Sequence, residues 1–327
     1  MTDQTATDGR AQEETTLEAW VVVYLKGIAM GAADSVPGVS GGTIALITGI
    51  YERLISAIAS LDPRAARHLL RVHRTSGRRA LKTRLLAMDV PFLIVLGTGV
   101  LSALVLVSRV MHTAITTAPG LTGAFFFGLI AASVVVLREL FALDSPGRIA
   151  GGVVGFGMAF LVAGATRDTG GGDPLLPVVF GVAAIAVSAM ILPGVSGAFF
   201  LYLFGLYEHL TGELTAFVDG LIGLVTGTWT VEGVIAPATS VAVAGVGGLL
   251  GLLAFARVIR WALDTYRAAT LTFLIALMVG SLRKPAGDVL GASAGAGPTW
   301  LAGVLVAGGV GGGAVLALDY YTESLAY

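Results

Sequence analysis

The chain has 327 residues, of which 55% are hydrophobic and 13% are charged, and its mean hydropathy is +0.86. A soluble protein of this length cannot cover so much apolar surface, so the composition indicates several membrane spans and excludes a soluble enzyme. The absence of cysteine excludes disulfides, thiolate metal sites and cysteine nucleophiles. The four histidines show no metal-ligand spacing, so we expect no metal and no other cofactor, and the charge pattern does not point to nucleic acid.

The chain begins with a polar, acidic stretch, and we expect residues 1–17 to form a disordered cytoplasmic tail. This stretch has no basic start leading into a short apolar run, so it does not resemble a cleaved signal peptide. Residues 18–59 follow as two apolar pieces joined at Pro37-Gly38. Their lengths allow either one re-entrant hairpin or two short crossings.

A basic loop is predicted at residues 61–84, which carry eight Lys or Arg and one acid. Cytoplasmic loops of membrane proteins are enriched in Lys and Arg, so this loop and the N-terminus are expected on the cytoplasmic side of the cell membrane. Contact of the loop with anionic lipid headgroups is an alternative role for the same charges.

Six further apolar stretches are predicted to cross the membrane, near residues 88–109, 120–138, 148–166, 235–256, 268–283 and 299–318. A second hinged segment, 174–210, lies between the third and fourth crossings. If both hinged segments are re-entrant, the cytoplasmic side holds fourteen Lys and Arg and the opposite loops hold three. We therefore predict an all-α polytopic fold with an inverted repeat, in which each re-entrant hairpin precedes three transmembrane helices, over 18–166 and 174–320.

One phrase occurs twice, as Val-Pro-Gly-Val-Ser-Gly-Gly at 36–42 (the first phrase) and Leu-Pro-Gly-Val-Ser-Gly-Ala at 192–198 (the second phrase). Each is followed by Gly-Ile/Leu-Tyr-Glu, so nine of nineteen positions are identical between 36–54 and 192–210. Chance would give about one or two. Broken helices at corresponding places in two halves of a membrane protein are the strongest sequence pointer to a binding site.

The phrase has the chemistry of an anion site. Proline stops the preceding helix, glycine allows close approach of a ligand, and serine precedes a new helix whose free N–H groups attract an anion. We expect the two helix starts to converge near the membrane midplane. The predicted substrate-binding residues are Gly38, Ser40, Gly41, Gly42, Thr43, Gly194, Ser196 and Gly197. The alternative is a packing kink, in which small residues allow close helix contact.

Ionisable residues within or beside the hinged segments are predicted to form a proton-coupling or polar relay, since charges at membrane depth are costly unless they are functional or paired. They are Lys26, Asp34, Glu52 and Glu208, and the two glutamates are expected to end their hairpin helices. Asp34, which has no acidic counterpart in the second half, is the candidate proton carrier. Arg283, at a span end, either snorkels to the interface or binds a phosphate.

The run from Gly31 to Glu52, including Asp34-Ser-Val-Pro-Gly, and the second run, from Ser188 to Glu208, resemble the paired motifs of a prokaryotic membrane family. That family, formerly a domain of unknown function, is assigned as polyprenyl-phosphate (undecaprenyl-phosphate) transporters. The resemblance implies a flippase that recycles the lipid carrier to the cytoplasmic leaflet and assigns its site to the following positions: Asp34, Ser40, Thr43, Glu52, Ser196 and Glu208. Ala198 and Phe199 replace Gly42 and Thr43 of the first copy, which makes the second copy less polar.

Two other functions remain open from the sequence. A small-anion channel or exchanger would use the same helix starts for chloride. An intramembrane serine protease also uses Gly-x-Ser-Gly, but it needs a histidine beside the serine, and His112 is expected in an outer loop. The sequence therefore favours a transporter of a phosphate-bearing lipid over an enzyme.

Overall fold

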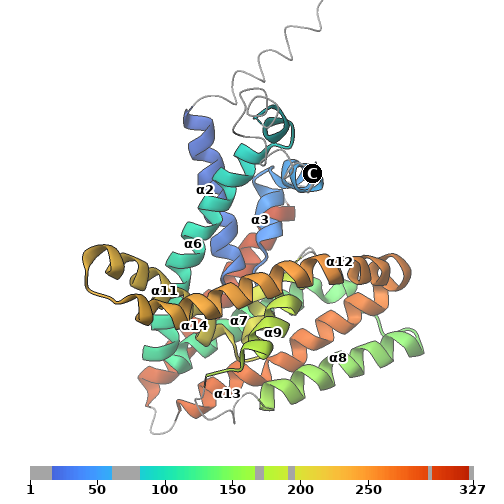
Figure 1. Cartoon of the computed structure of the whole chain (residues 1–327). Coiled ribbons are helices and arrows are strands. Elements are labelled where there is room, and N and C mark those ends of the chain that lie inside the picture. The colour runs from blue at the N-terminus through green and yellow to red at the C-terminus, as the bar shows by residue number, and fades with distance from the viewer. Residues whose placement is uncertain (1–16, 61–81, 166–172, 191–195, 294–296, 324–327) are drawn as a thin grey trace, which may run out of the picture. The chain divides into compact units, whose positions relative to one another are not determined.

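The computed structural model describes residues 17–60, 82–165, 173–190, 196–293 and 297–323, and these residues form helices and turns without strands (Figure 1). The helices are α2 (Leu17–Asp34), α3 (Gly41–Ile47), α4 (Tyr51–Ser60), α6 (Val90–Thr117), α7 (Pro119–Val136), η2 (Leu137–Leu140), α8 (Pro146–Ala165), α9 (Leu176–Ala189), α10 (Gly197–Leu203), α11 (Tyr207–Thr226), α12 (Val231–Ser281), α13 (Arg283–Gly291) and α14 (Pro298–Glu323). Residues 82–87 are also helical.

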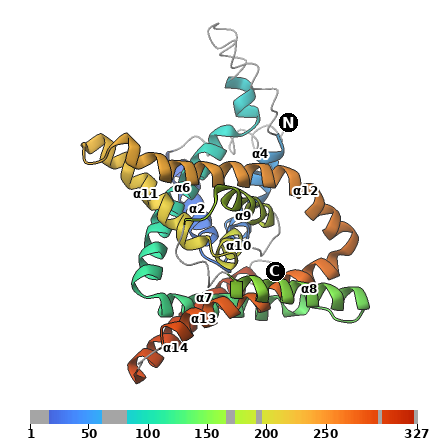
Figure 2. The same cartoon turned by 60° about the horizontal axis from the view of Figure 1, so that its bottom comes forward.

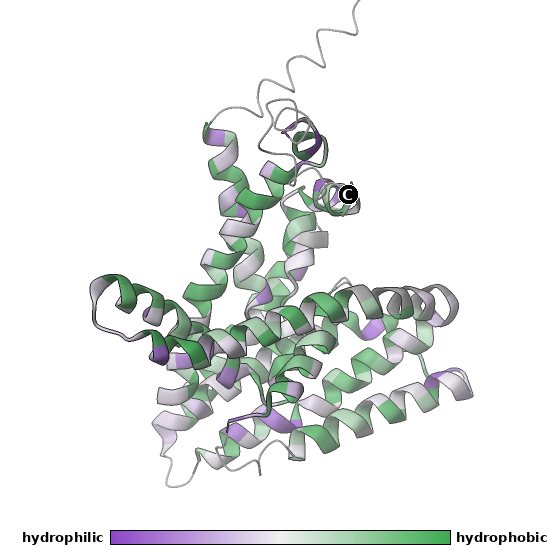
Figure 3. Cartoon of the chain, viewed as in Figure 1, coloured by the Kyte–Doolittle hydropathy of each residue, from purple (hydrophilic) through white to green (hydrophobic). Residues whose placement is uncertain are grey.

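Within the part of the chain that the structure describes, six helical stretches are long and apolar enough to cross a membrane (Figure 3). They are Val90–Thr117, Pro119–Leu140, Pro146–Ala165, Val231–Leu252, Thr265–Gly291 and Pro298–Tyr321. Each overlaps one of the six predicted crossings, so the prediction of an all-α polytopic membrane protein is confirmed. The re-entrant hairpins, the inverted repeat and the cytoplasmic side stay predictions.

Several segments expected to be loops are helical. Helix α11 continues to Thr226, beyond the hinged segment predicted at 174–210, and α6 continues to Thr117, beyond the crossing predicted at 88–109. Helix α12 runs through the expected loop 257–267 and is interrupted only at Tyr266, whose φ and ψ angles are −132° and 39° (Figure 2). Hydropathy marks where apolar sequence ends, whereas a helix ends where its backbone hydrogen bonds find other partners.

Both copies of the repeated sequence fold in the same way after the phrase. A seven-residue helix, α3 or α10, ends at a glycine with positive φ, and the next helix begins two residues later at tyrosine. The φ angles of Gly49 and Gly205 are 70° and 74°. The hydrogen bonds have the Schellman pattern in both copies: Gly49 N to Leu46 O and Ile50 N to Ala45 O, and Gly205 N to Tyr202 O and Leu206 N to Leu201 O.

This shared turn changes the predicted positions of the two glutamates. Glu52 and Glu208 lie in the first turns of α4 and α11, rather than at the ends of hairpin helices. The prediction was wrong because the glycine turn ends the short helix before the glutamate and a new helix starts at the preceding tyrosine. Carboxylates in a first turn face the positive end of the helix dipole, which stabilises them.

The helices form two compact units. Unit 1 contains α2 to Ala33, α3, α4 and α6 to Leu104, and unit 2 contains residues 34–40, the remainder of α6 and α7 to α14. The core of unit 1 is formed by Ala45, Ile50, Ala57, Phe92 and Leu96. Glycines bring α2 and α6 together, since a Cβ on Gly27 would lie 2.3 Å from the carbonyl oxygen of Leu96.

Two polar contacts tie the short helices of unit 1 to their neighbours. The Lys26 ammonium donates to the carbonyl of Thr48 at 2.6 Å, where it stabilises the C-terminal end of α3. Arg53 forms a two-point ion pair with Asp89, with distances of 2.6 and 3.1 Å, and its guanidinium lies over the ring of Phe92. Lys26 therefore has a structural partner in addition to any role in a polar relay.

Unit 2 is built around α7, whose residues Phe126, Leu129 and Ile130 are buried in the main hydrophobic core. Helix α14 packs closely along α7 (Figure 2), because a Cβ on Gly311 would lie 2.2 Å from the carbonyl oxygen of Phe125. Gly311 thus serves helix packing. Helix α12 packs against α9 and α8 on either side of its bend.

We expect Gly49→Ala to lower the free energy of unfolding by about 1–2 kcal/mol, the cost of a left-handed conformation for a residue with a side chain. Steric crowding does not cause this loss of stability, since no atom lies within 4 Å of the added Cβ. Gly97→Ala in α6 is the matched control: its Cβ is equally uncrowded and its backbone is helical, so it should be neutral or stabilising. Thermal unfolding in detergent measures both, and equal effects would contradict the explanation.

Candidate functional site

Helix α2 ends at Asp34 and α3 begins at Gly41, and we call residues 34–40 the break. Three hydroxyl groups from elsewhere in unit 2 hold the break in place. The hydroxyl of Tyr207 donates to the carbonyl of Ser35 at 2.5 Å, that of Ser196 to Val36 at 3.2 Å, and that of Ser133 to Gly38 at 3.0 Å. Carbonyls freed by a broken helix have no water to bind in an apolar environment, so side-chain donors must replace the lost helical bonds. The break is consequently a structured element.

One residue of the second phrase contacts the first phrase at this break, whereas the convergence of the two helix starts stays a prediction. Ser196, from the second phrase, occupies the N-cap position of α10 with φ −97° and ψ 130°, but its hydroxyl binds Val36 of the first phrase and makes no capping hydrogen bond. The hollow between them, lined by Gly38, Ser196, Phe199 and apolar residues of α12, holds only about 10 Å³. A phosphate does not fit there in this conformation.

The remaining predicted binding residues of the phrases lie around the two short helices. Ser40 is buried directly before α3, whose first residues are Gly41, Gly42 and Thr43. Gly197 begins α10 and is buried. Gly194 lies outside the described residues. The binding role of these residues stays a prediction.

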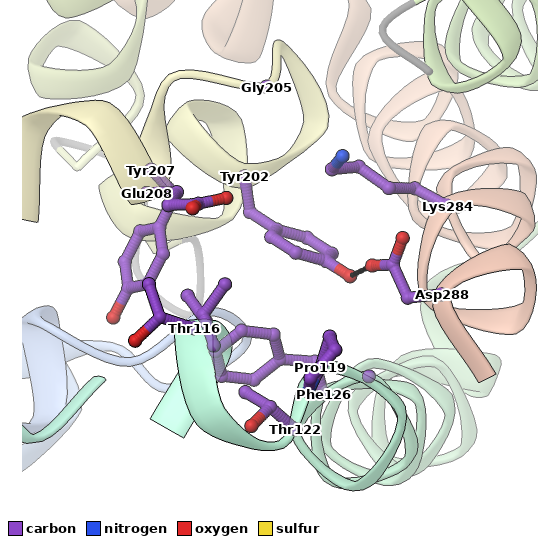
Figure 4. Close-up of a pocket in the computed structure, with 12 residues that line it drawn as sticks. Thr116, Pro119, Thr122, Phe126, Tyr202, Gly205, Tyr207, Glu208, Lys284 and Asp288 are labelled. Atoms are coloured by element: carbon purple, nitrogen blue, oxygen red, sulfur yellow. Dashed lines mark hydrogen bonds between the residues drawn. The ribbon is translucent and has the colours of Figure 1, made fainter. Parts of the chain in front are cut away.

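A larger, polar cavity of about 400 Å³ lies on the opposite side of Tyr207, within unit 2 (Figure 4). The turn Gly205–Glu208, the end of α6, the start of α7 and one face of α13 surround it. Its polar lining residues are Thr116, Thr122, Tyr202, Tyr207, Glu208, Lys284 and Asp288. The volume falls within the range of about 300–1,000 Å³ that is usual for small-molecule sites.

Lys284 and Asp288 stand one turn apart on α13 and face Tyr202 of α10 (Figure 4). The Tyr202 hydroxyl donates to Asp288 at 2.7 Å, and the Lys284 ammonium lies 5.3 Å from the centre of the Tyr202 ring. Among the residues that the structure describes, the Lys284 ammonium has no hydrogen bond and no ion pair. Lys284 is thus a cation available to an anionic ligand.

Glu208 lines the same cavity from the first turn of α11, and its carboxylate has no hydrogen-bond partner among the described residues. With Asp288 it places two carboxylates and one ammonium around one cavity. The Lys284 ammonium can attract an anion to this cavity, and the two carboxylates would repel it.

The other predicted relay residues are distributed elsewhere. Lys26 binds Thr48, Glu52 is exposed on α4, and Asp34 is the last residue of α2, half-buried beside the break. Arg283 does not line the cavity with Lys284: its guanidinium lies 4.3 Å above the centre of the Phe160 ring and donates to the carbonyl of Phe160 at 2.8 Å. The structure brings only Glu208 of this group into the cavity.

Lys284, Asp288 and Tyr202 were missed by sequence reasoning. Lys284 and Asp288 follow the end of the crossing predicted at 268–283, and Tyr202 stands in an apolar run. A usable signal exists in the i,i+4 spacing of a cation and an acid beside Pro285, which places both on one face of a helix. The partner across the cavity cannot be recognised from spacing, because 82 residues separate Tyr202 from Lys284.

The described residues contain neither a serine–histidine pair nor a metal cluster. No histidine contacts the Ser196 hydroxyl, which donates to a backbone carbonyl, and His112 lies on α6 against Gly212 with its Nδ1 buried and unpartnered. His112 was expected in a loop, so that placement was wrong. No group of three His, Cys, Asp or Glu residues in the described part could hold a metal ion.

Comparison with known proteins identifies the family. The sequence matches the undecaprenyl phosphate translocase-like family over residues 30–287, which include both phrases, α11 and Lys284. The chain belongs to this family. A relative of this translocase-like chain from Vibrio cholerae serotype O1 (strain ATCC 39315 / El Tor Inaba N16961), named polyprenyl-phosphate transporter, is 35% identical over 270 residues, covering 81% of this chain and 77% of the relative. No solved structure matches the chain.

The hydroxyl of Tyr207 is expected to stabilise the break of this translocase-like protein. Tyr207→Phe leaves the Ser35 carbonyl without that donor and should lower the free energy of unfolding by about 1–3 kcal/mol. Tyr51→Phe, the equivalent change in the first copy, is the control, since the Tyr51 hydroxyl has no hydrogen bond within the described residues. Denaturation of both variants in detergent tests this, and a harmless Tyr207→Phe would contradict it.

Proposed function

We propose that this protein is a transporter, and not an enzyme, that moves a polyprenyl phosphate between membrane leaflets, with the phosphate bound in the cavity beside Lys284. The observation that carries the proposal is an ammonium without an ion pair in a 400 Å³ polar cavity of an apolar helical protein of this family. An unpaired charge in such surroundings is costly, and an anionic ligand offsets that cost. The relative's printed name agrees with this substrate.

The phosphate has two sources of positive potential in the cavity. The Lys284 ammonium is one, and the first turn of α11 at Tyr207 and Glu208 is the other, because the N–H groups there have no helical acceptor. Tyr202 connects α10 to α13 beside the cavity, since its ring faces Lys284 and its hydroxyl donates to Asp288. The prenyl chain remains in an apolar environment while only the headgroup enters the cavity.

Proton coupling is the second part of the proposal. A phosphate adds negative charge beside Glu208 and Asp288, so the protonated form of one carboxyl becomes favoured while the phosphate is bound. Glu208 is the better candidate, because the Asp288 carboxylate already accepts a hydrogen bond from Tyr202. Asp34 keeps its predicted role as a proton carrier, and Asp34→Asn tests it in the same assay.

The break connects the cavity to the rest of the transport path. Tyr207 lines the cavity with its ring and binds Ser35, the residue after Asp34, with its hydroxyl. A movement of Tyr207 when the headgroup binds would therefore also change its hydrogen bond to Ser35 at the break. We propose that the re-entrant hairpins and the inverted repeat expose this region to each leaflet in turn, with the N-terminus and loop 61–84 on the cytoplasmic side.

Lys284→Gln is expected to reduce polyprenyl-phosphate transport in reconstituted vesicles by about ten- to a hundredfold, because a hydrogen bond to a charged group contributes about 1.5–3 kcal/mol. Lys82→Gln removes a lysine that does not line the cavity and should leave transport unchanged. Leaflet exposure of a labelled polyprenyl phosphate is the measurement. Chloride flux without lipid movement in the same vesicles would overturn the transporter proposal in favour of an anion channel.

Binding of the phosphate is expected to be accompanied by uptake of a proton, which makes the affinity fall as pH rises. In Glu208→Gln the proton uptake should disappear and the affinity should depend less on pH. Glu213→Gln, on the same helix but outside the cavity, is the control. Calorimetry in two buffers of different ionisation enthalpy counts the protons, and unchanged uptake in Glu208→Gln would exclude this residue as the carrier.

A further inference from the structure

A second hollow, the apolar groove, lies on the reverse sides of two helices that form the cavity. Its volume is about 360 Å³, and its lining residues are Phe127, Phe156, Phe160, Val279, Gly280, Leu282, Arg283, Ala286, Gly287 and Leu290. Helix α13 contributes to both hollows: Lys284 and Asp288 face the cavity, and Arg283 and Ala286 face the groove. In α7, likewise, Phe126 lines the cavity and Phe127 lines the groove.

The groove presents apolar side chains outward. Phe156 and Phe160 stack with ring centres 5.5 Å apart and remain 42% and 41% exposed, and Leu290 is 71% exposed. Large apolar side chains gathered in a hollow mark a site for an apolar partner. In a membrane protein that partner is a hydrocarbon chain.

Arg283 is the one charged residue in the lining of the groove, and it shapes the wall. Its guanidinium is fixed over Phe160 by the ring contact and by the hydrogen bond to the Phe160 carbonyl. Gly164 makes room for it, because a Cβ at this position would lie 2.5 Å from the guanidinium Nη1. Arg283 therefore holds Phe160 in place in the wall of the groove.

We propose that the groove binds the isoprenoid chain of the polyprenyl phosphate whose headgroup occupies the cavity. This inference rests on the proposed function, since it assigns the second half of the same substrate. Two features support it: the groove and the cavity share α7 and α13, and the cations of the groove and the cavity, Arg283 and Lys284, are consecutive residues. Arg283 acts as a positioning residue that holds Phe160 in the groove wall.

Ala286→Trp, which fills the groove, tests the proposal by chain length. Affinity for a long-chain polyprenyl phosphate should fall by about tenfold or more, equal to about 1.4 kcal/mol or the burial of about two methylene groups. Affinity for geranyl phosphate, which needs only the headgroup site, should stay unchanged. Val153→Trp, at a 67% exposed position of α8 outside the groove, is the control.

A photoactivatable polyprenyl phosphate applied to the unmodified protein gives an independent result if Ala286→Trp fails to fold. Crosslinks should map to Phe127, Phe156 or Leu290, and unlabelled polyprenyl phosphate should suppress them while excess phospholipid does not. Gly164→Ala should weaken them by displacing Arg283.

The outcomes separate the two proposals. Equal loss of long- and short-chain binding in Ala286→Trp, unchanged binding of both, or crosslinks suppressed equally by phospholipid would overturn the groove assignment alone. Failure of the unmodified protein to bind either phosphate, with Lys284→Gln indistinguishable from it, would overturn the proposed function and this inference with it.

Discussion

The hydrogen bonding of the broken backbone at residues 34–40 is the constraint on which the described site depends. A helix interrupted in apolar surroundings exposes carbonyls that water cannot reach, and each must find a donor within the protein. Ser133 of α7, Tyr207 of α11 and Ser196, which directly precedes α10, supply those donors. The hydroxyls therefore fix the path of the break, and they do so by connecting both copies of the repeated sequence.

This use of the hydroxyl groups explains why the polar cavity lies beyond the phrase. Ser196 is committed to Val36, and the short helix α10 that follows it is buried, which leaves no volume for a ligand at the serine itself. The Schellman turn at Gly205 then redirects the chain so that Tyr207 and Glu208 line the cavity. The repeated glycine is important here because only a residue without a side chain takes this left-handed turn at little cost.

The cavity places one cationic side chain and two acidic side chains around the same space. In the proposed mechanism Lys284 would attract the phosphate, while the carboxylates of Glu208 and Asp288 would limit how strongly it binds. A transporter has to release what it binds, so a site with partly opposed charges suits transport better than a purely cationic one. The apolar groove on the other side of α7 and α13 would hold the part of the lipid that no polar site accepts.

The sequence by itself determined the membrane class, the positions of the six spans found in the described residues and the break after Pro37, because these depend on local composition and on the conformational limits of proline. It also pointed to Glu208. Tertiary structure alone decided which groups surround the cavity: Tyr202, Lys284 and Asp288 meet only after α10 and α13 pack against α7. It also decided that Ser196 binds backbone and that Arg283 lies over Phe160, since pairings between distant segments are set by packing and leave no spacing rule in the chain.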